Sequence, residues 1–221
     1  MKMSQSDHFF APGMTRIGEG AFFGCENLES VTIPDSVTGI GAEAFFGCKN
    51  LKSVTITDGV TSIDYRAFSE CSSLTSINIP NSVTSIGEGA FKSCEKLESV
   101  TIPDGVTSIG VATFYDCGLR NMIIPNSIKS IGEDAFSSCN NLSSITLADG
   151  LISIEKKAFR NCNNLSYITI PDSVESIGYG AFEKSTELIM SDRLKKSLNF
   201  EHDIENSPYF WDIDTDDPWD W

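Results

Sequence analysis

Cysteine is the residue type whose spacing in this chain most directly suggests chemistry. The seven cysteines lie 23 residues apart, with one interval of 22: Cys25, Cys48, Cys71, Cys94, Cys117, Cys139 and Cys162. A zinc site needs cysteines and histidines a few residues apart, but the chain has no Cys-x-x-Cys pair and no histidine near a cysteine. Cysteines of neighbouring units would be near enough for a disulfide, but parallel side chains give poor disulfide geometry. The sequence therefore predicts a ladder of buried free thiols and no metal site.

The remaining reactive residue types give little support for catalysis. The two histidines, His8 and His202, lie at opposite ends of the chain. No nucleophilic serine motif, glycine-rich phosphate loop or metal triad is present. The run Asp212-x-Asp214-x-Asp216 resembles the start of a calcium loop, but Asp217 occupies the sixth position, where an EF-hand requires glycine. We therefore predict no catalytic residues, no cofactor and no enzymatic activity.

A repeat of 23 residues extends over most of the chain and dictates its architecture. Leucine recurs in each unit, and cysteine recurs in all but the last, where Ser185 replaces it. Most units carry a Pro-Asp or Pro-Asn turn, and phenylalanine follows five residues after a recurring isoleucine. The phenylalanines are Phe22, Phe45, Phe68, Phe91, Phe114, Phe136, Phe159 and Phe182. A fixed period of this size is typical of a solenoid, in which each unit buries its apolar side against its neighbours.

Each unit contains three kinds of local pattern. The stretch around Leu51, Val54 and Ile56 ends with apolar residues at alternate positions, which is typical of a short strand. A turn follows, and then a second short extended piece such as Val83–Ile86. The Gly-x-x-Ala-Phe-x-x-Cys segment suits a single helical or 3₁₀ turn. We expect strands of successive units to pair in parallel, with inward ladders of Leu and Phe and outward ladders of Ser and Thr.

Charge and hydropathy restrict the class of partner. The net charge is −15, and nucleic acids and anionic membranes are bound through Lys and Arg, so neither is expected as a partner. No apolar run approaches the length of a membrane span, so membrane insertion is not expected. Met1–Asp7 is polar and lacks the layout of a secretory signal, which predicts a cytosolic protein or one whose leader and earlier repeats precede this chain. Ala11-Pro12-Gly13 reads as the second half of an upstream repeat.

The repeats resemble the leucine-rich repeats of the BspA type, also called the Treponema pallidum type, from about Phe10 to Leu188. This resemblance implies a repeat solenoid of the α/β, strand-rich class: a right-handed horseshoe with a concave parallel β-sheet. It also implies an adhesin-like protein, at the cell surface or secreted, that binds a protein or glycan. The family has no catalytic motif to carry over.

Candidate binding residues are those that interrupt the outward ladders of serine and threonine. Arg120, Asn121 and Ile123 do so in the shortened unit, and Tyr167 replaces serine two units later. Aromatic and arginine side chains are typical anchors of protein interfaces. Drift between duplicated units is the competing explanation of these changes.

The chain is expected to have three parts: an N-terminal partial repeat or cap (1–16), leucine-rich repeats (17–188), and a C-terminal cap with an acidic tail (189–221). A short polar helix over Ser191–Leu198 would cap the last unit. Residues 199–221 carry eight carboxylates and no Lys or Arg, and they hold Trp211, Trp219 and Trp221. These aromatics either complete the cap or form a peptide that docks on a partner. We expect a protein- or glycan-binding module, with a structural spacer of a larger surface protein as the alternative.

Overall fold

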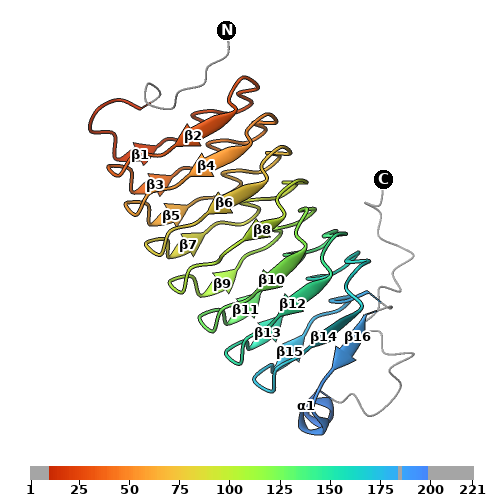
Figure 1. Cartoon of the computed structure of the whole chain (residues 1–221). Helices are drawn as coiled ribbons and strands as arrows, with labels where there is room; N and C mark the ends of the chain where they lie inside the picture. Colours follow the sequence, from red (N-terminus) through yellow and green to blue (C-terminus); the bar gives the residue numbers. More distant parts are fainter. Residues whose placement is uncertain (1–9, 184–185, 199–221) are drawn as a thin grey trace.

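The computed structural model describes residues 10–183 and 186–198, which form a solenoid of short parallel strands (Figure 1). Two rows of strands run along its length, and each turn of the solenoid, here called a coil, contributes one strand to each row. The odd-numbered strands are β1 (Arg16–Ile17), β3 (Gly39–Ile40), β5 (Ser62–Ile63), β7 (Ser85–Ile86), β9 (Ser108–Ile109), β11 (Ser130–Ile131), β13 (Ser153–Ile154) and β15 (Ser176–Ile177). The even-numbered strands are β2 (Ser30–Thr32), β4 (Ser53–Thr55), β6 (Ser76–Asn78), β8 (Ser99–Val100), β10 (Asn121–Ile123), β12 (Ser144–Thr146), β14 (Tyr167–Thr169) and β16 (Glu187–Ile189).

Strands of successive coils pair in parallel, as the repeat predicts, within sheets of four or two strands: β1-β3-β5-β7 and β9-β11-β13-β15 in one row, and β2-β4-β6-β8, β10-β12 and β14-β16 in the other. Val31 lies opposite Val54 between β2 and β4, and Val54 lies opposite Ile77 between β4 and β6. In each of these strands the central residue is buried and the two flanking residues are exposed. This alternation is what a strand gives when one face packs on the core and the other faces solvent.

Stacked phenylalanines form the centre of the core. The side chains from Phe45 to Phe182 are buried, and the rings from Phe22 to Phe182 stack at centroid separations of 5.0 to 5.7 Å. Phe22 at the first coil is only partly buried, and Phe10 packs edge-on against it at 5.8 Å. Aromatic pairs of this kind contribute about 0.5–1.5 kcal/mol each beyond the burial of their area. The inward phenylalanine ladder is therefore confirmed.

The segment before each cysteine differs from the helical or 3₁₀ turn that the sequence predicts. It is a run of turns in which alternate backbone N–H groups bond locally and to the next coil. Phe45 donates to the carbonyl oxygen of Ala67 in the next coil, whereas Cys48 donates to that of Phe45. Two positions per coil have positive φ, for example Glu43 (54°) and Gly47 (67°). A helix would turn every N–H toward its own segment, so bonding between coils prevents it.

The unit that lacks one residue is accommodated by a close backbone approach. A Cβ atom on Gly118 would lie 2.3 Å from the carbonyl oxygen of Glu95 in the preceding coil. Only glycine permits this contact. The ladders continue beyond this point, because β10 pairs with β12 in the expected register, with Met122 opposite Ile145.

The helix α1 (Asp192–Ser197) follows the last strand, where the sequence predicts a short polar helix. The Ser191 hydroxyl accepts a hydrogen bond from the backbone N–H of Leu194, which is an N-cap interaction. Leu194 is buried in the common core, and Leu198 packs against that core. Within residues 10–183 and 186–198, no helix is long and apolar enough to span a membrane.

Candidate functional site

The cysteines form the predicted ladder of buried thiols. Six are buried, and Cys25 in the first coil is partly buried. Each buried thiol donates a hydrogen bond to a phenylalanine carbonyl oxygen of the preceding coil, at 3.0 to 3.2 Å: Cys48 to Phe22, Cys71 to Phe45, Cys94 to Phe68, Cys117 to Phe91, Cys139 to Phe114 and Cys162 to Phe136. Burial raises the pKa of the Cys94 thiol from 9.0 to about 12, although its hydrogen-bonding environment partly opposes the shift. These thiols are structural groups held in the neutral form.

The described part of the chain brings together no set of three or more His, Cys, Asp or Glu side chains that could hold a metal ion. The Asp212–Asp216 run and both histidines lie outside the described residues.

The outer face of the even-numbered strands carries the other candidate residues. Along most of its length it presents small hydroxyl side chains, such as Ser53 and Thr55 of β4. Towards the C-terminal end three larger side chains replace them. Ile123 of β10 is 73% exposed, Tyr167 of β14 is 54% exposed and Ile189 of β16 is 44% exposed. We call Ile123, Tyr167 and Ile189, with the residues between them on this face, the late face.

Strand register sets the spacing of these side chains. Ile123 lies opposite Thr146, and Thr169 lies opposite Ile189, while β12 and β14 are neighbours. Ile123 and Ile189 therefore belong to one ladder and are three coils apart, about 14 Å at ~4.8 Å per strand. Tyr167 lies between them on the adjacent ladder of the same face.

Arg120 and Asn121 are placed differently from the other two predicted residues. The Arg120 guanidinium lies 3.1 Å from the Glu98 carboxylate, and both side chains are exposed. The hydrogen bond and charge of Glu98 raise the pKa of Arg120. Asn121 is on the outer face, where its Oδ1 accepts a hydrogen bond from the Ser144 hydroxyl at 3.1 Å. Asn121 therefore borders the late face, and Arg120 is paired with the preceding coil.

The tryptophans Trp211, Trp219 and Trp221 lie outside the described residues. Their predicted role in binding stays a prediction.

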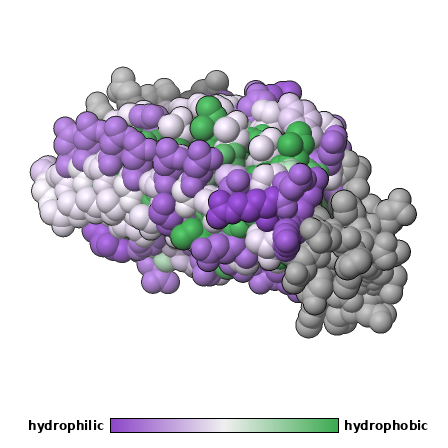
Figure 2. All heavy atoms as spheres, turned by 90° about the horizontal axis from the view of Figure 1, so that it is seen from below, coloured by the Kyte–Doolittle hydropathy of each residue, from purple (hydrophilic) through white to green (hydrophobic). Residues whose placement is uncertain are grey.

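Sequence reasoning did not single out one exposed aromatic pair. Phe23 is 56% exposed and stacks on Phe46, with ring centroids 4.9 Å apart. The two residues follow the core phenylalanines Phe22 and Phe45 directly, so the Phe-Phe doublets were the available signal. Other exposed hydrophobic residues are scattered, and Figure 2 shows one face of the molecule on which hydrophobic areas are small and separated by hydrophilic residues.

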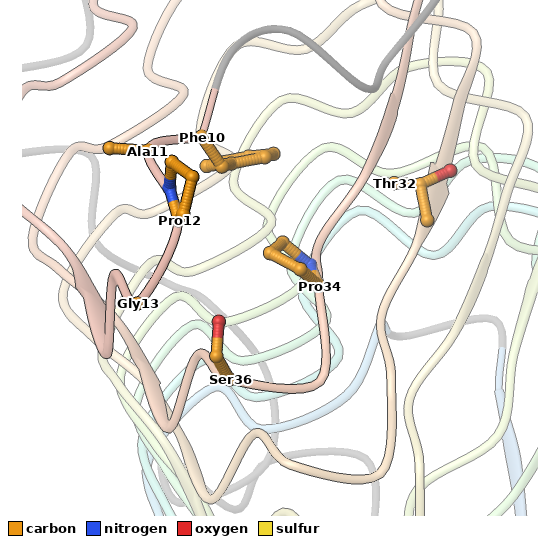
Figure 3. A pocket seen from close by; sticks show the side chains of 7 residues that line it. All are labelled: Phe10, Ala11, Pro12, Gly13, Thr32, Pro34 and Ser36. Carbon is orange, nitrogen blue, oxygen red and sulfur yellow. The ribbon is translucent and has the colours of Figure 1, made fainter.

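A hollow of about 260 Å³ lies near the first coil. Figure 3 shows Phe10, Ala11, Pro12 and Gly13 on one side and Thr32, Pro34 and Ser36 on the other. The lining has no charged group, so it offers no general acid, base or metal ligand. The turn from Ala11 to Met14, beside this hollow, has the same hydrogen bond as the turn in the next coil. The Met14 N–H donates to the carbonyl oxygen of Ala11, as the Val37 N–H donates to that of Pro34.

Comparison with known families identifies the repeat. The sequence profile of the BspA type leucine rich repeat region, with six copies, matches residues 3–119 and 107–200. The chain belongs to the BspA-type leucine-rich repeat family. The resemblance seen in the sequence is thereby confirmed, together with the solenoid fold.

Solved structures of bacterial leucine-rich repeat proteins are similar to this BspA-type chain. The Treponema pallidum leucine-rich repeat protein is 31% identical, with a TM-score of 0.64 over 69% of this chain and 72% of that one. A leucine-rich repeat protein from Eubacterium ventriosum is 35% identical, with a TM-score of 0.66 over 72% of this chain and 43% of that one. A leucine-rich cell surface protein from Faecalibacterium prausnitzii is 32% identical, with a TM-score of 0.55 over 80% and 65%.

The match spans less than half of the Eubacterium protein and about two thirds of the Faecalibacterium protein. No curated protein matches the BspA-type chain. The comparisons thus establish a leucine-rich repeat module.

Proposed function

We propose that this chain is a non-enzymatic module that binds a protein or glycan partner through the late face, in an adhesin-like role. The observation that carries the proposal is the exposure of Ile123, Tyr167 and Ile189 on one face that otherwise presents small hydroxyl residues. Exposed apolar area costs solubility, and tyrosine is among the residue types that are enriched at the energetic hot spots of protein interfaces.

The rigidity of the scaffold supports binding at this face. The strands that carry Tyr167 and Ile189 are hydrogen-bonded in register; Ile168 at the centre of β14 is buried, and Leu188 at the centre of β16 is partly buried. Side chains on paired strands are held in place better than those on loops, which lowers the entropy lost on binding.

We propose that this binding occurs at the cell surface or outside the cell. The Faecalibacterium relative is described as a cell surface protein, and we extend that location, at the surface or secreted, to this chain. The net charge of −15 disfavours nucleic acid and anionic membrane as partners.

The test uses a variant that returns three positions to the residue that recurs in the array: Ile123→Thr, Tyr167→Ser and Ile189→Thr. A control variant changes the same face earlier in the array: Ser53→Ala, Ser76→Ala and Asn78→Thr. Affinity capture from extracts of source cells and of cells they contact, quantified by mass spectrometry, compares both with the unchanged chain. The proposal expects a partner that the chain and the control retain and the first variant loses.

Three other results would contradict this proposal. Equal retention by all three proteins would place recognition outside the late face, and capture of nothing by any of them would favour a structural spacer. A partner lost only by a chain that ends at Leu198 would move the function to residues 199–221.

A further inference from the structure

Tyr167 and Glu187 lie opposite each other on the outer face. They are register partners in the parallel pair of β14 and β16, and both side chains are exposed. Parallel strands are about 4.8 Å apart, so the phenol ring and the carboxylate stand side by side. An aromatic face beside a carboxylate attracts a cation, since the ring contributes its quadrupole and the carboxylate its charge.

The same solenoid already pairs cations with tyrosines at two other places. The Arg66 guanidinium lies 5.0 Å from the ring centroid of Tyr65, and the Lys92 ammonium lies 4.9 Å from that of Tyr115. Over Tyr167, by contrast, none of the described lysines or arginines is found. None of them forms an ion pair with Glu187 either, so within the described residues this cation position is unfilled.

Aliphatic side chains flank this position. Ile189 lies two residues after Glu187 on the same strand and the same face, and Ile123 lies further along the ladder of Ile189. The surface therefore combines one cation position with apolar contacts at Ile189, about 7 Å along the strand from Glu187, and at Ile123, two coils before Tyr167. This arrangement suits a polypeptide that carries lysine or arginine near aliphatic residues.

Charge decides between the candidate occupants. A second copy of this chain would bring another −15 to a surface that already carries Glu187. The chain's own residues 199–221 bring eight carboxylates and no Lys or Arg. Both are repelled, whereas a basic partner is attracted by the site and by the net charge.

We infer that the late face takes a lysine or arginine side chain of a basic polypeptide partner between Tyr167 and Glu187, with Ile123 and Ile189 against its aliphatic residues. This inference rests on the proposed function and adds the class of partner.

The test is an NMR titration of the isotopically labelled full chain with two synthetic peptides. One is acetyl-Gly-Lys-Val-Arg-Gly-amide, and its counterpart has glutamine at both basic positions. We expect the basic peptide to shift the amide signals of residues 144–146, 167–169 and 187–189, and the glutamine peptide to leave them unchanged.

Four variants locate the interaction. Tyr167→Ser and Glu187→Gln are each expected to weaken binding of the basic peptide about two- to fivefold, as an exposed cation–π contact or ion pair would. Tyr167→Phe keeps the aromatic face and should keep the affinity. Glu175→Gln removes one exposed carboxylate outside the late face and is the charge-matched control.

An equal loss from Glu175→Gln and Glu187→Gln would overturn the inference, since the attraction would then be diffuse. Signal shifts confined to residues 199–221 would also overturn it. The inference and the proposed function fail separately. A captured partner that depends on Tyr167 but is not displaced by the basic peptide would retain the proposed binding face and reject only the cationic class of partner.

Discussion

The Cys94 thiol donates a hydrogen bond to the backbone carbonyl oxygen of Phe68, with the sulfur 3.2 Å from the oxygen. The two residues belong to successive coils, so the bond joins neighbouring units through the core. The same relationship recurs along the array and gives cysteine a structural reason to repeat with phenylalanine. It also makes a prediction about reactivity.

We expect the six buried thiols to resist alkylation in the folded protein. At pH 8 a thiol whose pKa is about 12, such as Cys94 or Cys139, is almost entirely protonated, and the thiolate is the reactive form. Iodoacetamide labelling followed by mass spectrometry should modify Cys25 first and the others only in denaturant. Labelling of Cys94 as fast as Cys25 without denaturant would contradict the buried ladder.

Truncation of a central phenylalanine should destabilise the solenoid strongly. Phe91 is fully buried between Phe68 and Phe114, at 5.7 and 5.5 Å, so we expect Phe91→Ala to lower the free energy of unfolding by about 3–5 kcal/mol. Urea denaturation measures this change. The exposed Ile123→Ala is the control and should change stability by about 0.5 kcal/mol or less. A shift well below 1 kcal/mol for Phe91→Ala would contradict the inward placement.

Positive φ at non-glycine residues predicts a stabilising substitution. Ala112 has φ 50°, and Gly89, at the same position of the preceding coil, has φ 60°. Left-handed backbone costs an L-residue about 1–2 kcal/mol, partly offset by the greater freedom of glycine in the unfolded chain. Ala112→Gly should therefore raise the melting temperature, and Gly89→Ala should lower it. Changes of the same sign in both variants would reject this explanation.

The Asp134 carboxyl predicts a pH dependence. Burial raises its pKa, and the charge of Glu133 adds to the shift, while Ser137, Lys157 and Arg160 oppose it. The folded state therefore holds this proton to higher pH than the unfolded state, so the group destabilises the protein increasingly as pH rises through the folded pKa. Asp134→Asn should increase stability at pH 7 and less at pH 4.

Asp104→Asn is the control for this measurement. Asp104 lies exposed at a turn where asparagine stands in two other coils, at Asn81 and Asn126. We expect its replacement to change stability little at either pH. An equal gain from both variants at pH 7 would point to the overall negative charge instead.

Repeated positions of this chain were predictable from sequence, and positions that vary between coils were less so. Phe91 and Ser53 recur in register, so their inward and outward directions follow from the pattern. The run of turns was not predicted, because residues as different as Glu43, Arg66 and Gly89 share one left-handed position and give no common signal.

The candidate site shows the same division. The exposure of Ile123 and Tyr167 follows from strand alternation. The pairing of Arg120 with Glu98 depends on side-chain conformation, which the pattern does not specify. Glu187 and Ile189 lie beyond the last full unit, so only the strand pairing of β14 with β16 brings them beside Tyr167.

Photo-crosslinking tests the central claim, that the late face contacts a partner, most directly. The photoreactive amino acid p-benzoylphenylalanine would replace Tyr167 or, as a control, Ser76, which lies at the same ladder position earlier in the array. We predict a crosslinked partner from position 167, none from position 76, and suppression of the adduct by the basic peptide. Adducts in equal yield from both positions, or none from position 167, would contradict the account.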